Sequence, residues 1–476
     1  MIIGDNMDIK RTKIIASIGP ATENVEILTS LVNEGMDVVR VNFSHGTYEE
    51  YDKVVELVEK VREKSKKQIG ILFDTKGPDF RLLDVENGCI NLVEGENIRI
   101  VKKGSIGTKN GLLVNHNEVI KNIKVDDTVL INDGLIVLKV VSVEKDGITC
   151  KVISGGEVSS HKGVSVPGRD LHLPFMSEND FNDITYACSK NGDFIALSFV
   201  SSKEDILKVR EVLDNNNSTM QIISKIENET ALENIDEIID SSDGIMVARG
   251  DLGVEIPVER LPIIQKMLVQ KCREKGKICI VATEMLASME KAPRPTRAEV
   301  TDVANAVLDG CDAVMLSAET TVGLHPVEAV SYMSRICREA ENNYDYDYYF
   351  EYEHDKAITA AVAKAVVASI TEVDAKAVVV PTMGGHSARV MSNLKPKPII
   401  VAPTPTEDVA RKLSLAFGVI PVVVPVVDDF NELTEISRKT SQKILDLEKG
   451  DVIIITGGIH RRGKPNETNF IKIEEI

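Results

Sequence analysis

The sequence predicts an α/β protein, a (β/α)8 TIM barrel with an inserted all-β lid domain and a C-terminal α/β domain. Eight short apolar runs precede residue 318, and most are followed by a segment with helical periodicity. That periodicity is lost once, after the third run, and strand and helix patterns alternate again near the C-terminus. Continuous apolar strands separated by helices predict a parallel sheet covered on both faces, and eight of them predict a closed barrel.

The predicted barrel strands are rich in β-branched residues and end in polar ones. They are TKIIASI (12–18), DVVRVNF (37–43), IGILFD (69–74), FIALSFV (194–200), QIISKI (221–226), GIMVA (244–248), ICIVAT (278–283) and AVMLS (313–317). The segments between them, apart from the long third one, have the mixed polar and apolar pattern of helices that cover a barrel.

The predicted lid occupies the gap between Asp74 and about Arg169. Here the short strands ENIRIV, TVLINDGLIVLKVV and ITCKVIS alternate with glycine and asparagine turns, which predicts an all-β insertion of roughly ninety residues. Its roots, GPDFR (77–81) and HKGVSVPG (161–168), contain glycine and proline. These residues fit a hinge, and they fit an ordinary linker equally well.

A tyrosine-rich segment, ENNYDYDYYFEYE (341–353), separates the barrel from the last domain and is a linker or a docking segment. The strands AKAVVVP, PIIVA, VIPVVV and DVIIIT follow from about Asp355, and they predict a second α/β domain. We therefore expect four segments. They are residues 1–76 and 169–342 in the barrel, 77–168 in the lid and 343–476 in the C-terminal domain.

The chain is acidic, with 56 basic and 74 acidic residues and a net charge of −18 at pH 7. Such a charge repels nucleic acid and anionic membranes, although local basic pockets can still bind small phosphates. The seven cysteines form no CxxC pair, which is typical of a reduced intracellular protein. No apolar leader or membrane span is found. We expect a cytoplasmic protein with no nucleic-acid and no membrane partner.

Two strings carry the first chemical signal, SKIEN (224–228) and ARGDLGVE (248–255). Each follows an apolar strand, so Lys225, Glu227 and Asp251 are expected at neighbouring strand ends. Taken singly, each is ordinarily a solvated charge at the rim of a barrel. Together they have the composition of a phosphoryl-transfer site, in which carboxylates bind Mg²⁺ and a lysine neutralises the moving phosphoryl group.

The other predicted strand ends are also polar, and in a barrel of this kind they meet at one mouth. They carry Arg40, Asn42, Ser44, Asp74, Thr75, Gly250 and Thr283. We therefore expect one active site at the carboxyl ends of the strands.

Motifs in register along the whole chain resemble those of the pyruvate kinase family. They are RVNFSHG, DTKGP, KGVSVPG, SKIEN, ARGDLGVE, ATEMLASM, PTRAEVTDVANAVLDG and SAETTVGLHPVEAV. The resemblance implies transfer of phosphate from phosphoenolpyruvate to ADP, giving pyruvate and ATP in glycolysis. It also implies Mg²⁺ (or Mn²⁺) and K⁺ as cofactors, and a homotetramer.

The resemblance also assigns residues. Lys225 matches the lysine that stabilises the transferred group, and Arg40 matches the arginine that holds its phosphate. Glu227 and Asp251 match the Mg²⁺ ligands. Substrate contacts match Arg40, Arg249, Gly250, Asp251 and Thr283, the K⁺ ligands match Asn42, Ser44, Asp74 and Thr75, and nucleotide contacts match Asn42, Phe43, Ser44, His45, Arg81 and Lys162.

Two regions depart from the family pattern. Asp79 stands where the family commonly has a glutamate that accompanies K⁺ dependence, and it keeps the negative charge on a shorter side chain. PTMGGHSAR (381–389) resembles a phosphate-binding turn that enters a helix, with Thr382, Gly385 and Ser387 as the possible site of a sugar-phosphate or AMP effector. The same pattern is also that of a glycine turn which only begins a helix.

Two other functions compete with the kinase. A catalytically weak paralogue could sense metabolites through its C-terminal domain, but the complete set of site residues disfavours this. A metal-dependent aldolase or lyase could use the same barrel mouth, but such an enzyme needs neither Lys162 nor a nucleotide site.

Overall fold

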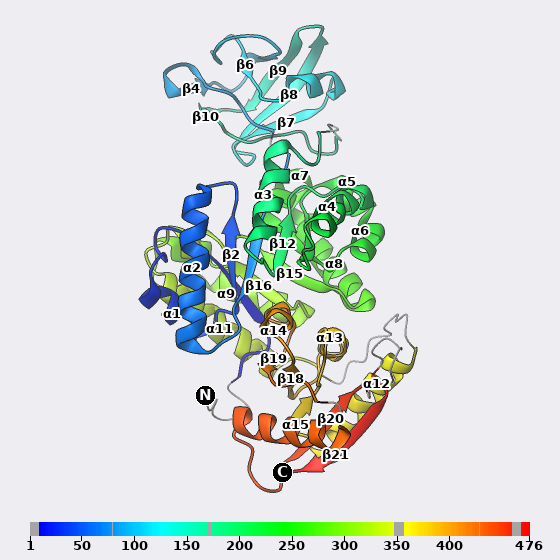
Figure 1. Ribbon diagram of the computed structural model, residues 1–476. Helices are drawn as coiled ribbons and strands as arrows, with labels where there is room; N and C mark the ends of the chain where they lie inside the picture. The colour runs from blue at the N-terminus through cyan, green and yellow to red at the C-terminus, as the bar shows by residue number, and fades with distance from the viewer. Residues whose placement is uncertain are drawn as a thin grey trace.

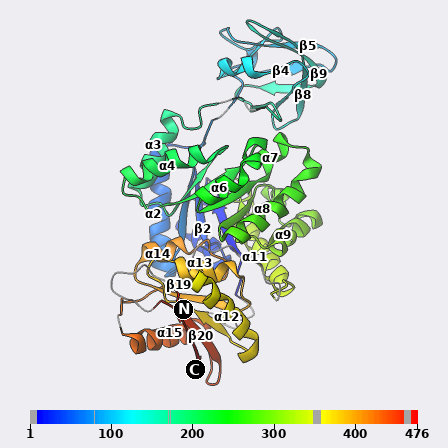
Figure 2. The same ribbon diagram turned by 90° about the vertical axis from the view of Figure 1, so that its right-hand side faces the viewer.

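The computed structural model describes residues 9–78, 80–169, 171, 173–346, 357–427, 429–458 and 468–476. Three bodies follow one another along the length of the molecule, with the lid at one end, the barrel in the middle and the C-terminal domain at the other end (Figure 1). A view from the side shows that the lid is joined to the barrel by thin connections, whereas the C-terminal domain packs broadly against it (Figure 2).

The barrel is closed by eight parallel strands in the order β1-β16-β15-β14-β13-β12-β3-β2. They are β1 (Lys13–Ser17), β2 (Val38–Asn42), β3 (Gly70–Asp74), β12 (Phe194–Leu197), β13 (Gln221–Ile226), β14 (Gly244–Ala248), β15 (Ile278–Ala282) and β16 (Ala313–Leu316). Each lies within a run predicted from the sequence, so the predicted barrel is confirmed. β3 and β12 pair directly although the lid is inserted between them.

Helices surround the barrel and pack their apolar faces on its strands. They are α1 (Val25–Glu34), α2 (Tyr48–Ser65), α3 (Glu178–Ser189), α4 (Lys203–Asn215), α5 (Glu229–Glu233), α6 (Ile235–Ser241), α7 (Arg249–Glu255), α8 (Leu261–Lys275), α9 (Arg297–Asp309), α10 (Ala318–Thr321) and α11 (Pro326–Asn342). Capping boxes fix several of their starts, as at Thr47, Ser177 and Thr296. Of the described helices, none is long and apolar enough to cross a bilayer.

The lid is built of two sheets, in which most strands pair antiparallel, and it has its own apolar core. Its strands are β4 (Cys89–Leu92), β5 (Asn97–Val101), β6 (Leu112–Leu113), β7 (Thr128–Ile131), β8 (Ile136–Glu144), β9 (Gly147–Ser154), β10 (Gly156–Ser159) and β11 (Val164–Ser165). The predicted strands correspond to β5, β7, β8 and β9. The shorter strands β4, β6, β10 and β11 were not predicted.

The C-terminal domain is a five-stranded sheet with helices on its faces. Its elements are α12 (Ala357–Val373), β17 (Ala377–Val379), α13 (His386–Asn393), β18 (Ile399–Thr404), α14 (Glu407–Lys412), β19 (Val419–Val423), α15 (Phe430–Leu445), β20 (Val452–Gly457) and β21 (Phe470–Glu475). β21 pairs antiparallel with β20 and was not predicted. Most of the tyrosine-rich segment lies outside the described residues.

Buried ion pairs join the C-terminal domain to the floor of the barrel. Asp193, directly before β12, accepts from Arg411 on α14 at 2.9 Å and from Arg62 on α2 at 3.3 Å. Asp312, before β16, pairs with Lys395 from the C-terminal domain. Both aspartates are almost fully buried, so the two domains share charges that water does not reach.

Candidate active site

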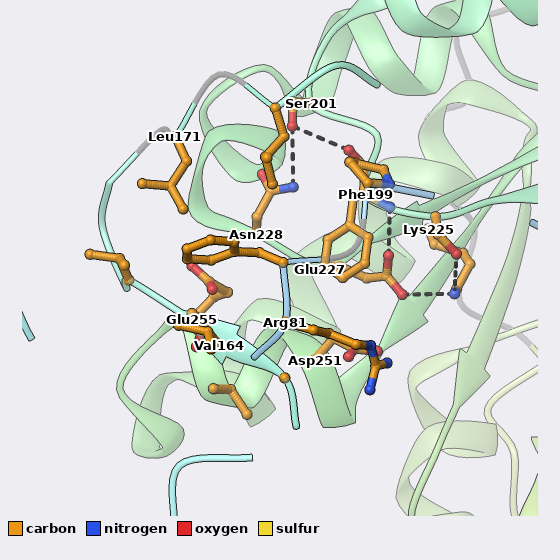
Figure 3. A pocket seen from close by; sticks show the side chains of 18 of the residues that line it. Arg81, Val164, Leu171, Phe199, Ser201, Lys225, Glu227, Asn228, Asp251 and Glu255 are labelled. Carbon is orange, nitrogen blue, oxygen red and sulfur yellow. Dashed lines mark hydrogen bonds and ion pairs between the residues drawn. The ribbon is translucent and has the colours of Figure 1, made fainter. Parts of the chain in front are cut away.

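A cavity of about 990 Å³ lies between the carboxyl ends of the barrel strands and the lid. It is lined by predicted site residues from both bodies: Arg40, Asn42, Ser44, His45, Arg81, Lys162, Lys225, Glu227 and Asp251. Figure 3 shows Arg81, from the root of the lid, beside Asp251, and a dashed line joins Lys225 to Glu227. The barrel mouth and the lid therefore enclose one polar chamber.

Lys225 is the centre of the site's buried charge. It lies near the end of β13, whose six residues are all buried. Its ammonium is 2.8 Å from Glu227 Oε1 and 3.3 Å from Asp74 Oδ1, and it donates to Ser198 Oγ at 2.7 Å. A cation in such surroundings is fixed in position and keeps its charge.

The protonation of these groups follows from their neighbours. Burial disfavours the ammonium of Lys225, but the carboxylates of Asp74 and Glu227 outweigh it and raise its pKa. Burial also opposes ionisation of Asp74, yet Lys225 and Arg40 hold the pKa of this carboxyl below its ordinary value. For Glu227, burial raises the pKa to about 7 against the pull of Lys225, and Asp251 adds to the rise.

Glu227 and Asp251 are the carboxylates predicted to hold a divalent cation. Glu227 Oε2 accepts from the amide of Phe199 at 2.6 Å, and its buried Oε1 lies 2.8 Å from the ammonium of Lys225. Asp251 is exposed at the mouth, on the first turn of α7. Within the described chain no three His, Cys, Asp or Glu side chains gather into a metal cluster. Two carboxylates fit Mg²⁺, which usually takes its remaining ligands from substrate oxygens and water.

The predicted K⁺ residues come together at the ends of β2 and β3. Asn42 is opposite Asp74 in the register of the two strands, and Thr75 follows directly. The side-chain oxygen of Asn42 accepts from the amide of Ser44 at 3.0 Å. Arg40, on the same strand, donates to Asp74 Oδ2 at 2.7 Å. These neutral and anionic oxygens are chemically suited to a hard cation.

Thr283 lies in a strained turn after β15, with a φ of 66°, and Glu284 follows with a φ of 54°. The hydroxyl of Thr283 accepts from the amide of Gly250 at 2.8 Å and donates to the carbonyl of Ala282 at 2.6 Å. The side chain of Arg249 donates to the carbonyl of Thr283 at 2.8 Å. Arg249 is thus buried behind the turn and holds its shape, rather than extending into the cavity.

Five of the six residues predicted to contact nucleotide line the chamber, and the sixth, Phe43, is buried beneath it. Asn42, Ser44 and His45 lie in the chamber beneath the lid, and Arg81 and Lys162 face it from the lid roots. Phe43 is buried, and its ring stacks on Phe73 with centroids 5.3 Å apart. Of these predicted residues, Phe43 therefore contributes packing under the site rather than a side chain to the cavity lining.

Ser198, which was not predicted from the sequence, connects two parts of the site. Its hydroxyl accepts from Lys225 and donates to the carbonyl of Thr75 at 2.7 Å. Its amide donates to the hydroxyl of Thr75 at 3.1 Å. Phe199 then takes a φ of 55°, which turns its amide toward Glu227. The available signal was the serine that directly follows the apolar strand residues FIAL.

In the candidate effector turn, the hydroxyls of Thr382 and Ser387 already make hydrogen bonds within the protein. Thr382 Oγ1 accepts from the amide of Gly385 at 3.0 Å, and the hydroxyl of Ser387 accepts from Thr468 at 2.9 Å. Gly385 has a φ of 82° and precedes α13 directly. Asp79 lies outside the described residues.

A fixed ammonium, two carboxylates suited to a metal and cationic side chains from a lid define a phosphotransferase. Models described as the pyruvate kinase barrel domain and the pyruvate kinase alpha/beta domain match residues 9–330 and 360–474. The chain belongs to the pyruvate kinase family. This family is known to use a divalent metal and potassium, and it acts on phosphoenolpyruvate and ADP and forms pyruvate.

Individual relatives are similar along their length. A pyruvate kinase of Bacillus licheniformis is 43% identical over 98% of this chain and 80% of its own. One from Clostridium acetobutylicum is 40% identical over 98% of this chain and 100% of its own. A crystal structure of a pyruvate kinase from Cryptosporidium parvum has a TM-score of 0.94 at 37% identity, covering 99% of this chain and 97% of that one.

Proposed function

We propose that this chain transfers the phosphoryl group of phosphoenolpyruvate to ADP at the barrel mouth. The observation that carries the proposal is the ammonium of Lys225, held 2.8 Å from Glu227 and 3.3 Å from Asp74 in the chamber beneath the lid. Catalysis of this transfer needs positioning and charge neutralisation more than covalent chemistry. A buried, immobile cation supplies both.

In the proposed reaction, the bond between phosphorus and the enol oxygen breaks as a β-phosphate oxygen of ADP bonds to phosphorus. Lys225 neutralises the phosphoryl oxygens during transfer, and Arg40 binds the same group through its guanidinium before transfer. The enolate of pyruvate that remains takes a proton at its methylene carbon. Thr283 contacts the substrate there, and because a hydroxyl is a poor acid, relayed water is the expected proton source.

Glu227 and Asp251 would hold Mg²⁺ or Mn²⁺, which when bound supplies positive charge to the substrate oxygens. The amides of Arg249 and Gly250 at the start of α7 would receive the substrate carboxylate, and Gly250 would then release its hydrogen bond to the Thr283 hydroxyl. Asn42, Ser44, Asp74 and Thr75 would hold K⁺ through oxygen atoms. The place of both Glu227 and Asp251 in the lining of the chamber supports the assignment of the divalent metal.

The nucleotide would lie between the 42–45 turn and the lid roots. Arg81 and Lys162 line this side of the cavity, so movement of the lid toward the barrel would bring them over the polyphosphate and exclude water. Tyr51 supports the turn from below, because its hydroxyl donates to the carbonyl of His45 at 2.7 Å.

We also propose the segment boundaries given above, a homotetramer in the cytoplasm, and a sugar phosphate or AMP as effector. The family resemblance supports these proposals. For the effector turn, the internal hydrogen bonds of Thr382 and Ser387 leave the backbone amides of α13 as the groups best suited to phosphate.

A coupled assay with phosphoenolpyruvate and ADP separates the kinase from its alternatives. Pyruvate formation that needs both substrates, a divalent metal and Lys162 supports the proposal. Binding of metabolites without turnover would favour a sensor paralogue. Pyruvate release that is independent of ADP and unchanged by Lys162→Ala would favour a lyase.

A further inference from the structure

Both connections of the lid are held at the barrel by one carboxylate, that of Asp180 near the start of α3. Its Oδ1 accepts from the amide of Gly77, on the outbound connection, at 2.9 Å. Its Oδ2 accepts from Ser177, at the end of the return connection, through the amide at 2.9 Å and the hydroxyl at 2.6 Å. Asp180 is 3% exposed and is not part of the chamber lining. A carboxylate has acceptor sites on both oxygens, so it satisfies all three donors.

Gly77 is confined on its other side by Ser198. It has a φ of 69°, a backbone conformation that favours glycine. A Cβ at this position would lie 2.8 Å from the Cβ of Ser198 and 3.0 Å from the carbonyl oxygen of the same residue. Thr75, two residues earlier, is joined to Ser198 by two hydrogen bonds. The outbound connection is therefore fixed to the barrel as far as Gly77.

The chain passes between the barrel and the lid within a few residues of these contacts. On the outbound side Phe80, three residues after Gly77, already belongs to the apolar core of the lid. On the return side Leu173 packs against the core of the lid and Phe175 against the core of the barrel. The lid thus leaves the barrel at two points, and each is close to a group that Asp180 binds.

Arg81 and Lys162 are carried by one short paired segment that begins just beyond Gly77. Arg81 pairs with Gly163 in an antiparallel bridge, and the amide of Leu82 donates to the carbonyl of Lys162 at 2.9 Å. The pairing keeps the two cationic residues in place relative to each other. Four residues of chain span at most about 14 Å, so a shift of Gly77 would displace both residues.

We propose that Asp180 is a positioning residue for nucleotide binding, which holds Gly77 so that the paired segment presents Arg81 and Lys162 to the polyphosphate. This inference rests on the proposed function, in which these two side chains bind the nucleotide. Groups that are already in place pay less entropy when a ligand binds. Loss of the anchor should therefore weaken the binding of ADP, whereas phosphoenolpyruvate, which is bound by residues of the barrel, should be little affected.

Asp180→Asn tests the proposal, because it keeps the size of the side chain and replaces one acceptor oxygen by a donor. The new NH2 group faces an N–H of either Gly77 or Ser177, so one of these hydrogen bonds is lost. In titration calorimetry of the full chain with Mg²⁺, ADP should bind about tenfold more weakly and phosphoenolpyruvate should change by less than about threefold. Hydrogen exchange of the peptide that contains Gly77 should become about tenfold faster.

Ser177→Ala is the matched control for the start of α3. It removes the hydroxyl that accepts from the amide of Asp180 at 3.1 Å and caps the helix, and it leaves the bond between Asp180 and Gly77 in place. Its affinity for ADP should stay within about threefold of the unmodified chain. If Asp180→Asn does not fold, Asp180→Glu replaces it. Glutamate is a usual capping-box residue at this position, but its extra methylene moves the second oxygen away from Gly77, so ADP should again bind more weakly.

Weaker binding of ADP and faster exchange at Gly77 in the Asp180 variant, with neither change in Ser177→Ala, support the proposal. Equal losses of ADP and phosphoenolpyruvate affinity overturn it, as does an equal loss of ADP affinity in Ser177→Ala. Faster exchange at Gly77 without any loss of ADP affinity overturns it as well. If the unmodified chain binds neither substrate, the proposed function itself fails. If that chain binds both and the variants behave alike, only the inference about Asp180 fails.

Discussion

Replacing Lys225 by methionine removes the central positive charge of the site while keeping a similar side-chain length. We expect phosphoryl transfer to be lost, because the charge acts on the phosphoryl oxygens mainly in the transition state. Groups of this kind contribute roughly 3 kcal/mol or more to a barrier, which corresponds to a fall in kcat of about 10² or more.

The stability of this variant can be estimated from its neighbours. Asp74 keeps its contact with Arg40 at 2.7 Å, so Glu227 is the carboxylate that loses its cation. Removing one partner of a buried pair costs about 3–5 kcal/mol when the other stays charged. The pKa of Glu227 is already about 7, and it rises further without Lys225, so protonation limits the loss at neutral pH. Because the folded pKa is raised, the variant should lose stability as pH rises through that pKa.

The assay is pyruvate formation coupled to a reporter dehydrogenase, with Mn²⁺ binding measured in parallel between pH 7 and pH 9. Lys208→Met is the matched control, since Lys208 lines the same cavity but is 54% exposed and pairs with Asp205 at 3.5 Å. The control should keep kcat within about threefold. A Lys225→Met protein that is folded, binds Mn²⁺ and turns over at a near-normal rate would refute the assignment.

Three further predictions concern the surroundings of this lysine. Ser198→Ala should lower kcat about tenfold and raise the K⁺ concentration needed for activity, because one hydroxyl orients both the ammonium and the Thr75 carbonyl. The affinity for Mn²⁺ should fall about tenfold from pH 8 to pH 6, because a carboxyl with a pKa of about 7 is progressively protonated there. Activity should collapse when tetramethylammonium replaces K⁺, and Asp79→Lys should partly restore it by supplying the missing positive charge.

Each of these has a result that would count against it. Unaltered K⁺ dependence in Ser198→Ala would mean that the hydroxyl is only a packing group. Mn²⁺ affinity that does not vary between pH 6 and pH 8 would argue that Glu227 is ionised throughout or is not a ligand. Full activity of the unmodified chain without K⁺, Na⁺ or NH₄⁺ would show that Asp79 has already removed the need for the ion.

The barrel could be predicted because a strand that is buried on both faces is apolar at nearly every position of its sequence. Strands such as β14, GIMVA, are apolar at every position, and helical segments with a different period separate them. β21, with the sequence FIKIEE, alternates in the manner of a strand, but its isoleucines are exposed. Strand alternation was present there, and it was missed because it did not continue the pattern of buried strands.

The site was predictable where residue type alone carries the chemistry, as for Lys225 and Glu227. Ser198 was not, because a serine at a strand end has many ordinary roles, and its contacts with Lys225 and Thr75 join three strands far apart in sequence. The left-handed backbone conformation at Thr283 and Phe199 could not be predicted from the sequence either, since neither residue type favours it. Such conformations are imposed by the surrounding structure.

Asp193 and Asp312, at the floor of the barrel, bind the C-terminal domain and the barrel strands at the same time. Each binds a barrel-strand amide with one oxygen and a cation of the C-terminal domain with the other: Asp193 joins Ile71 to Arg411, and Asp312 joins Cys279 to Lys395. A fragment ending after the barrel would keep both carboxylates and lose both of these cations. The barrel is therefore not a separable module, and a shorter enzyme built from it would first need neutral residues at 193 and 312.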